Sequence, residues 1–192
     1  MSDADKIEAK EFELPLNYVK PAQKSLNEIL TADAQDESLN KYKQKLLGTN
    51  AENLVIDPTI SSNCILKSIA LEVDNVISNK VEFTKSKPPS DLSIAIKEGV
   101  NYRIVFEFYV QREIITGLKY CQKTSRHGIP VDKEVIMLGS YAPKKDFYTY
   151  KTTVCEAPKG MLHRGKYKVR SLLTDDDEQH LCEWGWQIEI TK

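Results

Sequence analysis

Apolar and polar residues alternate in several short runs after residue 60, and this two-residue period limits the chain to folds built from β-strands. In the run YRIVFEFYVQ at 102–111, large apolar side chains occupy every second position. Turn sequences such as KPPSD, YAPKKD and APKG separate the runs. Seven or more such strands predict an all-β domain in which two antiparallel sheets face each other across one core.

The first 60 residues follow a different pattern. They contain seven Lys, no Arg and eleven Asp or Glu, hence a net charge of −4, whereas the whole chain carries −1. Apolar residues recur at helical spacing in SLNEIL and in DESLNKYKQKLLG, where Gly48 suits a helix C-terminus. We therefore predict a flexible, partly helical N-terminal arm over 1–60 and a β-sandwich domain over 61–192.

The apolar stripes of these two helices need a surface to pack on. Neither helix exceeds the roughly 12–15 residues below which an isolated helix is marginal in water. The surface is either the protein's own body or a partner on which the arm folds. The helical pattern alone leaves both possibilities open.

The only two tryptophans, Trp184 and Trp186, fall in the run LCEWGWQIEI. Cys182, Ile188 and Ile190 share their face in an extended chain, so the run predicts one strand with an apolar face that carries both indoles. Two indoles side by side either fill the core of the sandwich or form the wall of an apolar cavity. Periodicity by itself favours the core.

Three consecutive aspartates precede this strand, in DDDE at 175–178. Carboxylates that hold Ca²⁺ usually alternate along a loop, whereas consecutive residues of an extended chain point to opposite sides. A solvated turn between two strands is therefore the preferred interpretation. A metal-dependent hydrolase is the competing one.

No other motif predicts catalysis or a cofactor. The sequence contains neither of the common phosphate-binding glycine patterns, nor G-x-S-x-G, nor H-E-x-x-H. Its four cysteines form no C-x-x-C pair, and its three histidines fall into no zinc-ligand spacing. A near-neutral charge, the lack of a secretory signal and the lack of a long apolar run predict a cytoplasmic protein that neither binds nucleic acid nor inserts into a membrane.

Segments along most of the chain resemble one known family. They include NYVKPAQKSLNEI and DESLNKYKQKLLG in the arm, and IKEGVNYR, REIITGLKY, VDKEVIMLGSYAP, EAPKGML, TDDD and W-x-W in the domain that follows. Their order and spacing, from about residue 17 to the C-terminus, resemble those of the Rho GDP-dissociation inhibitors.

This resemblance implies an immunoglobulin-like β-sandwich whose sheets part to hold the geranylgeranyl group of a prenylated Rho- or Rac-family GTPase, preferably in its GDP-bound form. The arm of that family forms a helical hairpin on the switch regions of the GTPase and slows GDP release. A monomeric inhibitor in a soluble one-to-one complex extracts the GTPase from membranes and catalyses no reaction. The alternative is a general carrier of prenylated proteins that lacks inhibition through the switch regions.

The resemblance also implies roles for individual residues. Ile114 and Leu162 are expected at strand ends or in loops, at the mouth of the pocket, whereas Tyr102 and Val169 suit the sandwich core equally well. Asp36 also suits the N-cap of the second helix. The implied prenyl-binding residues are Leu71, Ile94, Tyr102, Ile114, Leu162, Val169, Trp184 and Trp186. The implied GTPase-binding residues are Tyr18, Ser25, Asp36, Leu39, Tyr42, Asp132, Glu156 and Asp177.

The sequence departs from the family pattern near the expected rim of the pocket. His163 stands where Ala is common, Ser125 stands where an aromatic residue is usual, and SYAP replaces SYGP. We therefore expect the lip of the pocket and the choice of GTPase to differ from those of relatives.

Overall fold

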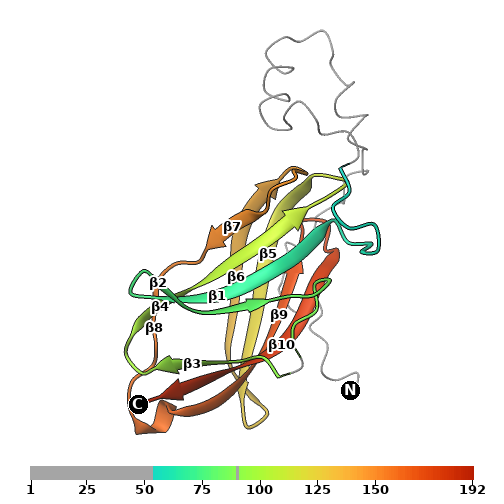
Figure 1. Ribbon diagram of the computed structural model, residues 1–192. Coiled ribbons are helices and arrows are strands. Elements are labelled where there is room, and N and C mark those ends of the chain that lie inside the picture. Colours follow the sequence, from blue (N-terminus) through green and yellow to red (C-terminus); the bar gives the residue numbers. More distant parts are fainter. Residues whose placement is uncertain (1–53, 90) are drawn as a thin grey trace.

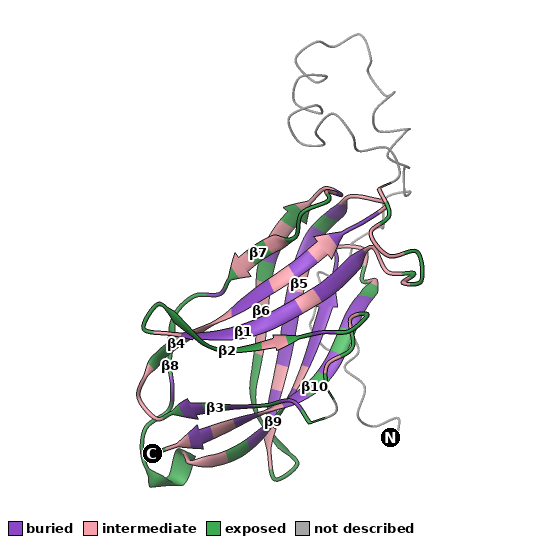
Figure 2. Cartoon of the chain, viewed as in Figure 1, coloured by how far each residue is buried: buried purple, intermediate pink, exposed green. Residues whose placement is uncertain are grey.

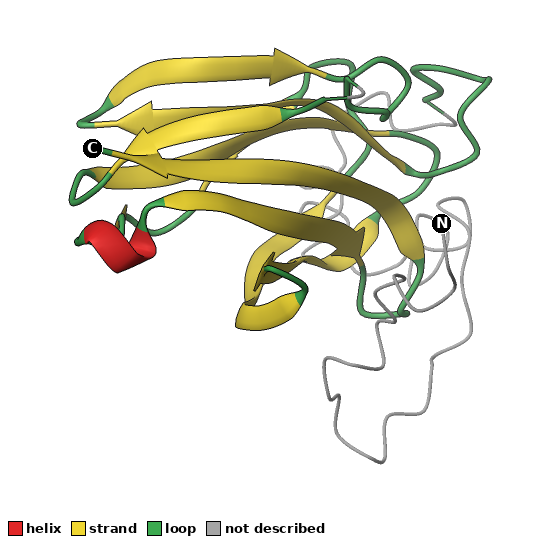
Figure 3. Ribbon diagram, turned by 90° about the horizontal axis from the view of Figure 1, so that it is seen from below, coloured by secondary structure: helices red, strands yellow, loops and turns green. Residues whose placement is uncertain are grey.

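The computed structural model describes residues 54–89 and 91–192 (Figure 1). Within this part of the chain two five-stranded sheets pack face to face, and the one helical element is a short 3-10 turn, η3 (Met161–His163), drawn red in Figure 3. This arrangement confirms the predicted all-β, immunoglobulin-like sandwich. The two helices predicted in the arm lie outside the described residues.

The first sheet has the strand order β2–β1–β4–β7, and β8 also pairs with β4. All of its pairings are antiparallel. The bounds are β1 (Cys64–Val73), β2 (Val76–Glu82), β4 (Asn101–Val110), β7 (Tyr148–Lys151) and β8 (Cys155–Glu156).

The second sheet has the order β3–β10–β9–β5–β6. Its edge strand β3 runs parallel to β10, which places Ile94 beside Ile188 and Ile96 beside Ile190, although these pairs are far apart in the sequence. The other pairings are antiparallel. The bounds are β3 (Ser93–Lys97), β5 (Ile115–Arg126), β6 (Ile129–Tyr141), β9 (Gly165–Thr174) and β10 (His180–Thr191).

The core lies between the two sheets, whose strands contain long stretches of buried residues, purple in Figure 2. The rings of Phe106 on β4 and Tyr120 on β5 meet across it with their centroids 4.6 Å apart. Trp184 stacks on Tyr120 at 6.0 Å and receives Phe83 edge-on at 5.7 Å. Aromatic contacts of this kind add about 0.5–1.5 kcal/mol to the free energy of burial, so they hold the two layers together at this level.

On the outer face of the first sheet, basic side chains cover two carboxylates through ion pairs. The Glu72 carboxylate is 3% exposed and lies between the side chains of Arg103 and Lys151, with the Lys151 Nζ at 2.6 Å. Glu107 pairs with Lys67 at 3.0 Å and with Lys80 at 2.8 Å. These contacts explain why β1 is buried on both of its faces, which simple alternation does not predict.

The segment that precedes β1 is fastened to the body by Gln111, a fully buried residue directly after β4. Its side-chain oxygen accepts hydrogen bonds of 3.1 Å from the backbone N–H groups of Ile56 and Asp57. Its side-chain nitrogen donates to the carbonyl oxygens of Ile60 at 3.0 Å and Ser62 at 2.8 Å. One amide group therefore fixes the path of the chain from residue 56 to the start of β1.

Candidate functional site

Five of the eight residues expected in a prenyl pocket lie on the facing inner surfaces of the two sheets. Leu71 comes from β1, Ile94 from β3, Val169 from β9, and Trp184 and Trp186 come from β10. Their exposed fractions lie between 1% and 5%, and all five belong to one hydrophobic cluster. The structure thus brings these residues together, and their contact with a lipid stays a prediction.

The other three expected residues are more exposed. Tyr102 on β4 is partly buried and packs against the cluster. Ile114 is also partly buried and directly precedes β5, while Leu162 in η3 is 84% exposed. Both therefore lie outside the regular strands, as the sequence suggested, and neither is part of the buried cluster.

A chain of buried hydrogen bonds crosses the inner face of the second sheet beside the tryptophans. The indole N–H of Trp186 donates to the Ser171 hydroxyl at 2.9 Å. That hydroxyl lies 2.9 Å from the Tyr120 hydroxyl, which donates to the side-chain oxygen of Gln122 at 2.7 Å. The Gln122 amide nitrogen then donates to Thr124 Oγ1 at 3.4 Å.

In the first bond of this chain Trp186 must be the donor and Ser171 the acceptor, because an indole nitrogen can only donate. Since the single proton of Tyr120 goes to Gln122, the bond between Tyr120 and Ser171 must be donated by Ser171. Burial raises the pKa of Tyr120 far above its ordinary value, so the phenol keeps that proton. Sequence alternation places each of these side chains on the inner face but does not show that they meet.

The inner face becomes acidic toward the β6 edge. In register with Thr124 and Gln122 of β5, β6 contributes Asp132 and Glu134. Burial raises the pKa of Tyr102 on the opposite sheet to about 12, and the charges of Cys155, Glu134 and Asp132 add to this effect. Burial and the charge of Asp132 likewise raise the pKa of Glu134.

Asp132 is exposed and Glu134 is half-buried, and both occupy positions of β6 that face the sheet of Tyr102. Asp132 was expected at the GTPase interface, and Glu134 was not. Because residues two apart on a strand share a face, alternation from Asp132 is the signal that would have indicated Glu134.

The three aspartates lie in the turn between β9 and β10, so the prediction of a turn between two strands is confirmed. Their contacts diverge: Asp175 Oδ1 accepts the backbone N–H of Gln179 at 2.9 Å, and Asp176 pairs with Lys119 at 2.7 Å. Asp177 is half-buried, and Asp175 is buried, so the turn is less solvated than expected. In the described ranges no group of three His, Cys, Asp or Glu residues is arranged to hold a metal ion.

The remaining expected GTPase contacts divide into two groups. Glu156 is exposed on β8 and pairs with Lys159 at 2.5 Å. The expected contacts in the arm lie outside the described residues, namely Tyr18, Ser25, Asp36, Leu39 and Tyr42.

Two of the three residues that depart from the family pattern, Ser125 and His163, lie outside the buried cluster. Ser125, near the end of β5, bonds to the carbonyl oxygen of Lys168 at 3.4 Å. The carbonyl oxygen of His163 in η3 accepts the Tyr167 hydroxyl at 2.8 Å. A different pocket lip stays a prediction.

Comparison with known proteins identifies the family. A family model described as RHO protein GDP dissociation inhibitor matches residues 2–192. A probable rho GDP-dissociation inhibitor of Caenorhabditis elegans is 47% identical over 91% of this chain and 92% of its own length. Rho GDP-dissociation inhibitor 1 of Homo sapiens is 42% identical over 96% and 90%, and human Rho GDP-dissociation inhibitor 3 is 41% identical over 90% and 76%.

The chain therefore belongs to the family of RHO protein GDP dissociation inhibitors, a class of GTPase regulators. Among the described residues, no helix has the length and apolar character needed to cross a membrane.

Proposed function

We propose that this protein binds a prenylated Rho- or Rac-family GTPase and holds its geranylgeranyl group between the two sheets. The observation that carries the proposal is the cluster of apolar side chains from both layers, including both tryptophans, beside an acidic edge. Membership of the family supports it. The protein acts by binding alone, catalyses no reaction and needs no cofactor.

The geranylgeranyl group needs an apolar site of its own size. Each buried CH₂ of a lipid anchor contributes about 0.8 kcal/mol, so only such a site competes with a bilayer. The side chains of the cluster pack on one another, and a close-packed interior has few voids, so entry of the lipid moves some of them. Trp186 stays in place through its bond to Ser171, while Leu71 and Ile94, which have no polar anchor, change position.

The acidic edge receives the basic segment that precedes the prenylated cysteine. Asp132, Glu134 and Glu156 supply the charge on β6 and β8. Exposed ion pairs are worth about 0–1 kcal/mol each, so this edge contributes more to orientation and association rate than to affinity.

The N-terminal arm over 1–60 contacts the switch regions of the GTPase, and the sandwich over 61–192 holds the lipid. Preferential binding of the arm to the GDP-bound arrangement slows nucleotide release, because a ligand shifts an equilibrium only through its difference in affinity. One protein binds one GTPase, and the complex is soluble and cytoplasmic, so the GTPase leaves the membrane. The residues of this contact are Tyr18, Ser25, Asp36, Leu39, Tyr42 and Asp177.

A truncation separates the two activities. Because Gln111 binds residues 56–62, deletion should end at residue 53 and leave Leu54 as the first residue, so that the sandwich keeps this support. We expect the truncated protein to retain prenyl-dependent binding and to lose inhibition of GDP release. Both are measured by titration of prenylated and unprenylated GTPase loaded with fluorescent GDP.

Asp36→Ala in the full chain tests one contact of the arm without deleting it. This variant should weaken GTPase binding without altering the sandwich. Full inhibition of GDP release by the truncated protein would contradict the role of the arm and favour a general prenyl carrier. Equal affinity for prenylated and unprenylated GTPase would contradict the lipid site.

A further inference from the structure

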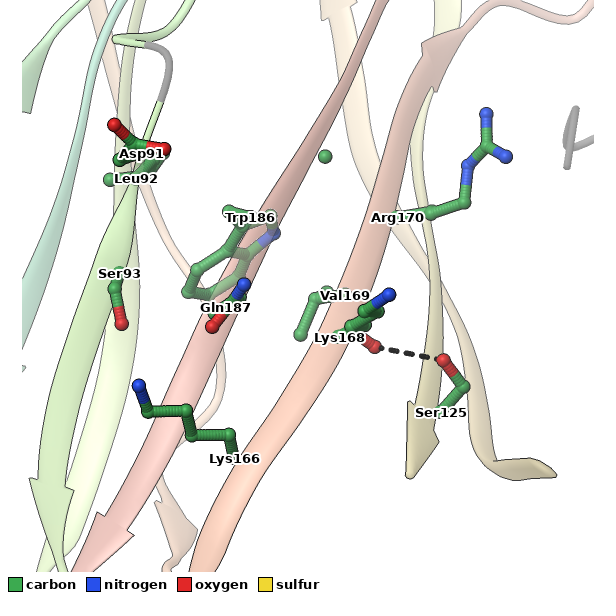
Figure 4. Close-up of a pocket in the computed structure, with 11 residues that line it drawn as sticks. Asp91, Leu92, Ser93, Ser125, Lys166, Lys168, Val169, Arg170, Trp186 and Gln187 are labelled. Carbon is green, nitrogen blue, oxygen red and sulfur yellow. Dashed lines mark hydrogen bonds between the residues drawn. The ribbon is translucent and has the colours of Figure 1, made fainter. Parts of the chain in front are cut away.

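A groove with three cationic side chains lies on the outer face of the second sheet, and its lining also includes Asp91 and three residues of the apolar cluster, Leu92, Val169 and Trp186. Its volume is about 580 Å³, and it extends over β3, β10, β9 and the end of β5 (Figure 4). Lys166, Lys168 and Arg170 follow one another along β9, with Gln187 of β10 and Ser93 of β3 across from them (Figure 4). The space exists partly because β10 presents Gly185, where an added Cβ would meet no atom within 4 Å.

The charge of this groove is only partly neutralised. Arg170 pairs with Glu183 at 2.7 Å, and Glu189 of β10 lies in register with Lys166. Lys166 and Lys168 are exposed, and neither forms an ion pair with another described residue. This is unlike the first sheet, whose outer face encloses the Glu72 and Glu107 carboxylates with cations.

The cationic surface continues across the sheet toward β6. Lys133 of β6 lies in register with Lys123 of β5, which lies in register with Arg170 of β9. Since Asp132 and Glu134 face the opposite layer, their neighbours along β6 face outward. These neighbours include Val131, Val135 and Met137, which are 52%, 50% and 53% exposed.

Cations beside exposed aliphatic side chains suit one kind of surface. Anionic lipid headgroups attract lysine and arginine, and the layer beneath them accepts apolar side chains. We propose that this face, made of the β9 groove and the outward residues of β6, docks on an anionic phospholipid surface. Docking holds the sandwich peripherally on the bilayer, with no segment crossing it.

This assignment favours a lipid surface over other anionic partners. A nucleic acid backbone would use the cations but leave the three half-exposed aliphatic side chains of β6 without a contact. The proposal goes beyond the inhibition of a GTPase, because docking needs only this chain and a bilayer.

Vesicle binding tests the proposal directly. The full chain is sedimented with phosphatidylcholine vesicles, and with vesicles in which part of this lipid is replaced by phosphatidylserine. We expect binding only to the second kind, and weaker binding at higher salt. Because each basic residue near an anionic surface contributes about a five-fold factor, Lys166→Ala with Lys168→Ala should weaken the partition about 25-fold.

Two further variants distinguish an effect of the groove from a general effect of net charge. Gly185→Glu places a carboxylate beside Arg170 in open space, so it should weaken docking without removing a cation. Lys85→Ala with Lys145→Ala removes the same charge as the double lysine variant outside the groove, so it should change docking little. Each variant is first checked for an unchanged circular dichroism melting curve.

Several results would overturn the proposal. They are the absence of wild-type binding to phosphatidylserine vesicles, equal binding to both kinds of vesicle, and equal weakening by the two double lysine variants. Free glycerophosphoserine that abolishes binding at low concentration would instead indicate a pocket for a single headgroup, and would also overturn docking on a surface. The affinity of the double lysine variant for prenylated GTPase in solution should equal that of wild type. Failure of the vesicle-docking proposal can therefore be told apart from failure of the proposed GTPase binding.

Discussion

The inner and outer faces of the second sheet are built from the same strands and differ in almost every property. The inner face carries Val169, Trp184 and Trp186 in a buried apolar cluster. The outer face carries the next residue on each strand. Lys168 and Gln187 line the groove, and Glu183 forms an ion pair with Arg170.

The difference shows how one sheet can present different side chains on its two faces. Alternation along β9 and β10 gives each face its own set of side chains, so a substitution on one face leaves the chemistry of the other intact. On the two proposals made above, lipid sequestration depends on one set of residues, and membrane docking depends on the other. Substitutions at Trp186 and Ser171 test this separation.

The largest effect is expected at Trp186. Trp186→Ala removes a large buried side chain and its hydrogen bond to Ser171, so it should lower the free energy of unfolding by about 3–5 kcal/mol. The adjacent outward residue is the matched control, and Gln187→Ala should change stability by less than about 0.5 kcal/mol. Urea unfolding followed by circular dichroism measures both, and comparable losses would contradict the separation of the two faces.

A smaller effect is expected at Ser171, the central member of the hydrogen-bond chain. Ser171→Ala leaves the Trp186 indole N–H without an acceptor and should lower the free energy of unfolding by about 1–3 kcal/mol. Lys168→Ala, on the outer face of the same strand, should cost less than about 0.5 kcal/mol. If Ser171→Ala were neutral in the same urea experiment, the chain would be incidental to stability.

The smallest effect is expected at Glu134, where the inner face becomes acidic. Burial and the charge of Asp132 raise the pKa of Glu134, so the folded protein holds this proton more tightly than the unfolded chain. The resulting stabilisation is complete below the ordinary pKa of a glutamate and is lost as pH rises through the raised value. Glu134→Gln should therefore be slightly more stable than wild type near neutral pH.

The pH dependence supplies the internal control for this last variant. Below about pH 4 the wild-type carboxyl is also neutral, so the two proteins should unfold at the same urea concentration. A variant that is less stable than wild type at neutral pH would show that the Glu134 carboxylate forms a favourable contact.

The sequence predicts local features of the fold well because they depend on neighbouring residues. A period of two was sufficient to place Trp184 and Trp186 on one face of β10, and the aspartate triplet was sufficient to indicate a turn. The burial of Asp175 was missed, since its acceptance of the Gln179 N–H depends on the geometry of the turn.

Features that depend on pairing between strands far apart in the sequence could not be predicted from neighbouring residues. The parallel alignment of β3 with β10 sets Ile94 beside Ile188, and no local signal specifies it. Tyr120 and Ser171 are 51 residues apart and meet only because β5 and β9 pair in one register. The groove on β9 was likewise missed, because it forms only where the β9 lysines lie beside Gly185 of the paired strand β10.

The Gln111 amide has a mechanical consequence for any partner that binds the N-terminal arm. Tension on the arm reaches Gln111 before it reaches β1, because Gln111 holds residues 56–62. The load is thereby shared with β4, the antiparallel neighbour of β1. A force on the segment before β1 therefore acts on β4 as well as on β1, through the four hydrogen bonds of Gln111.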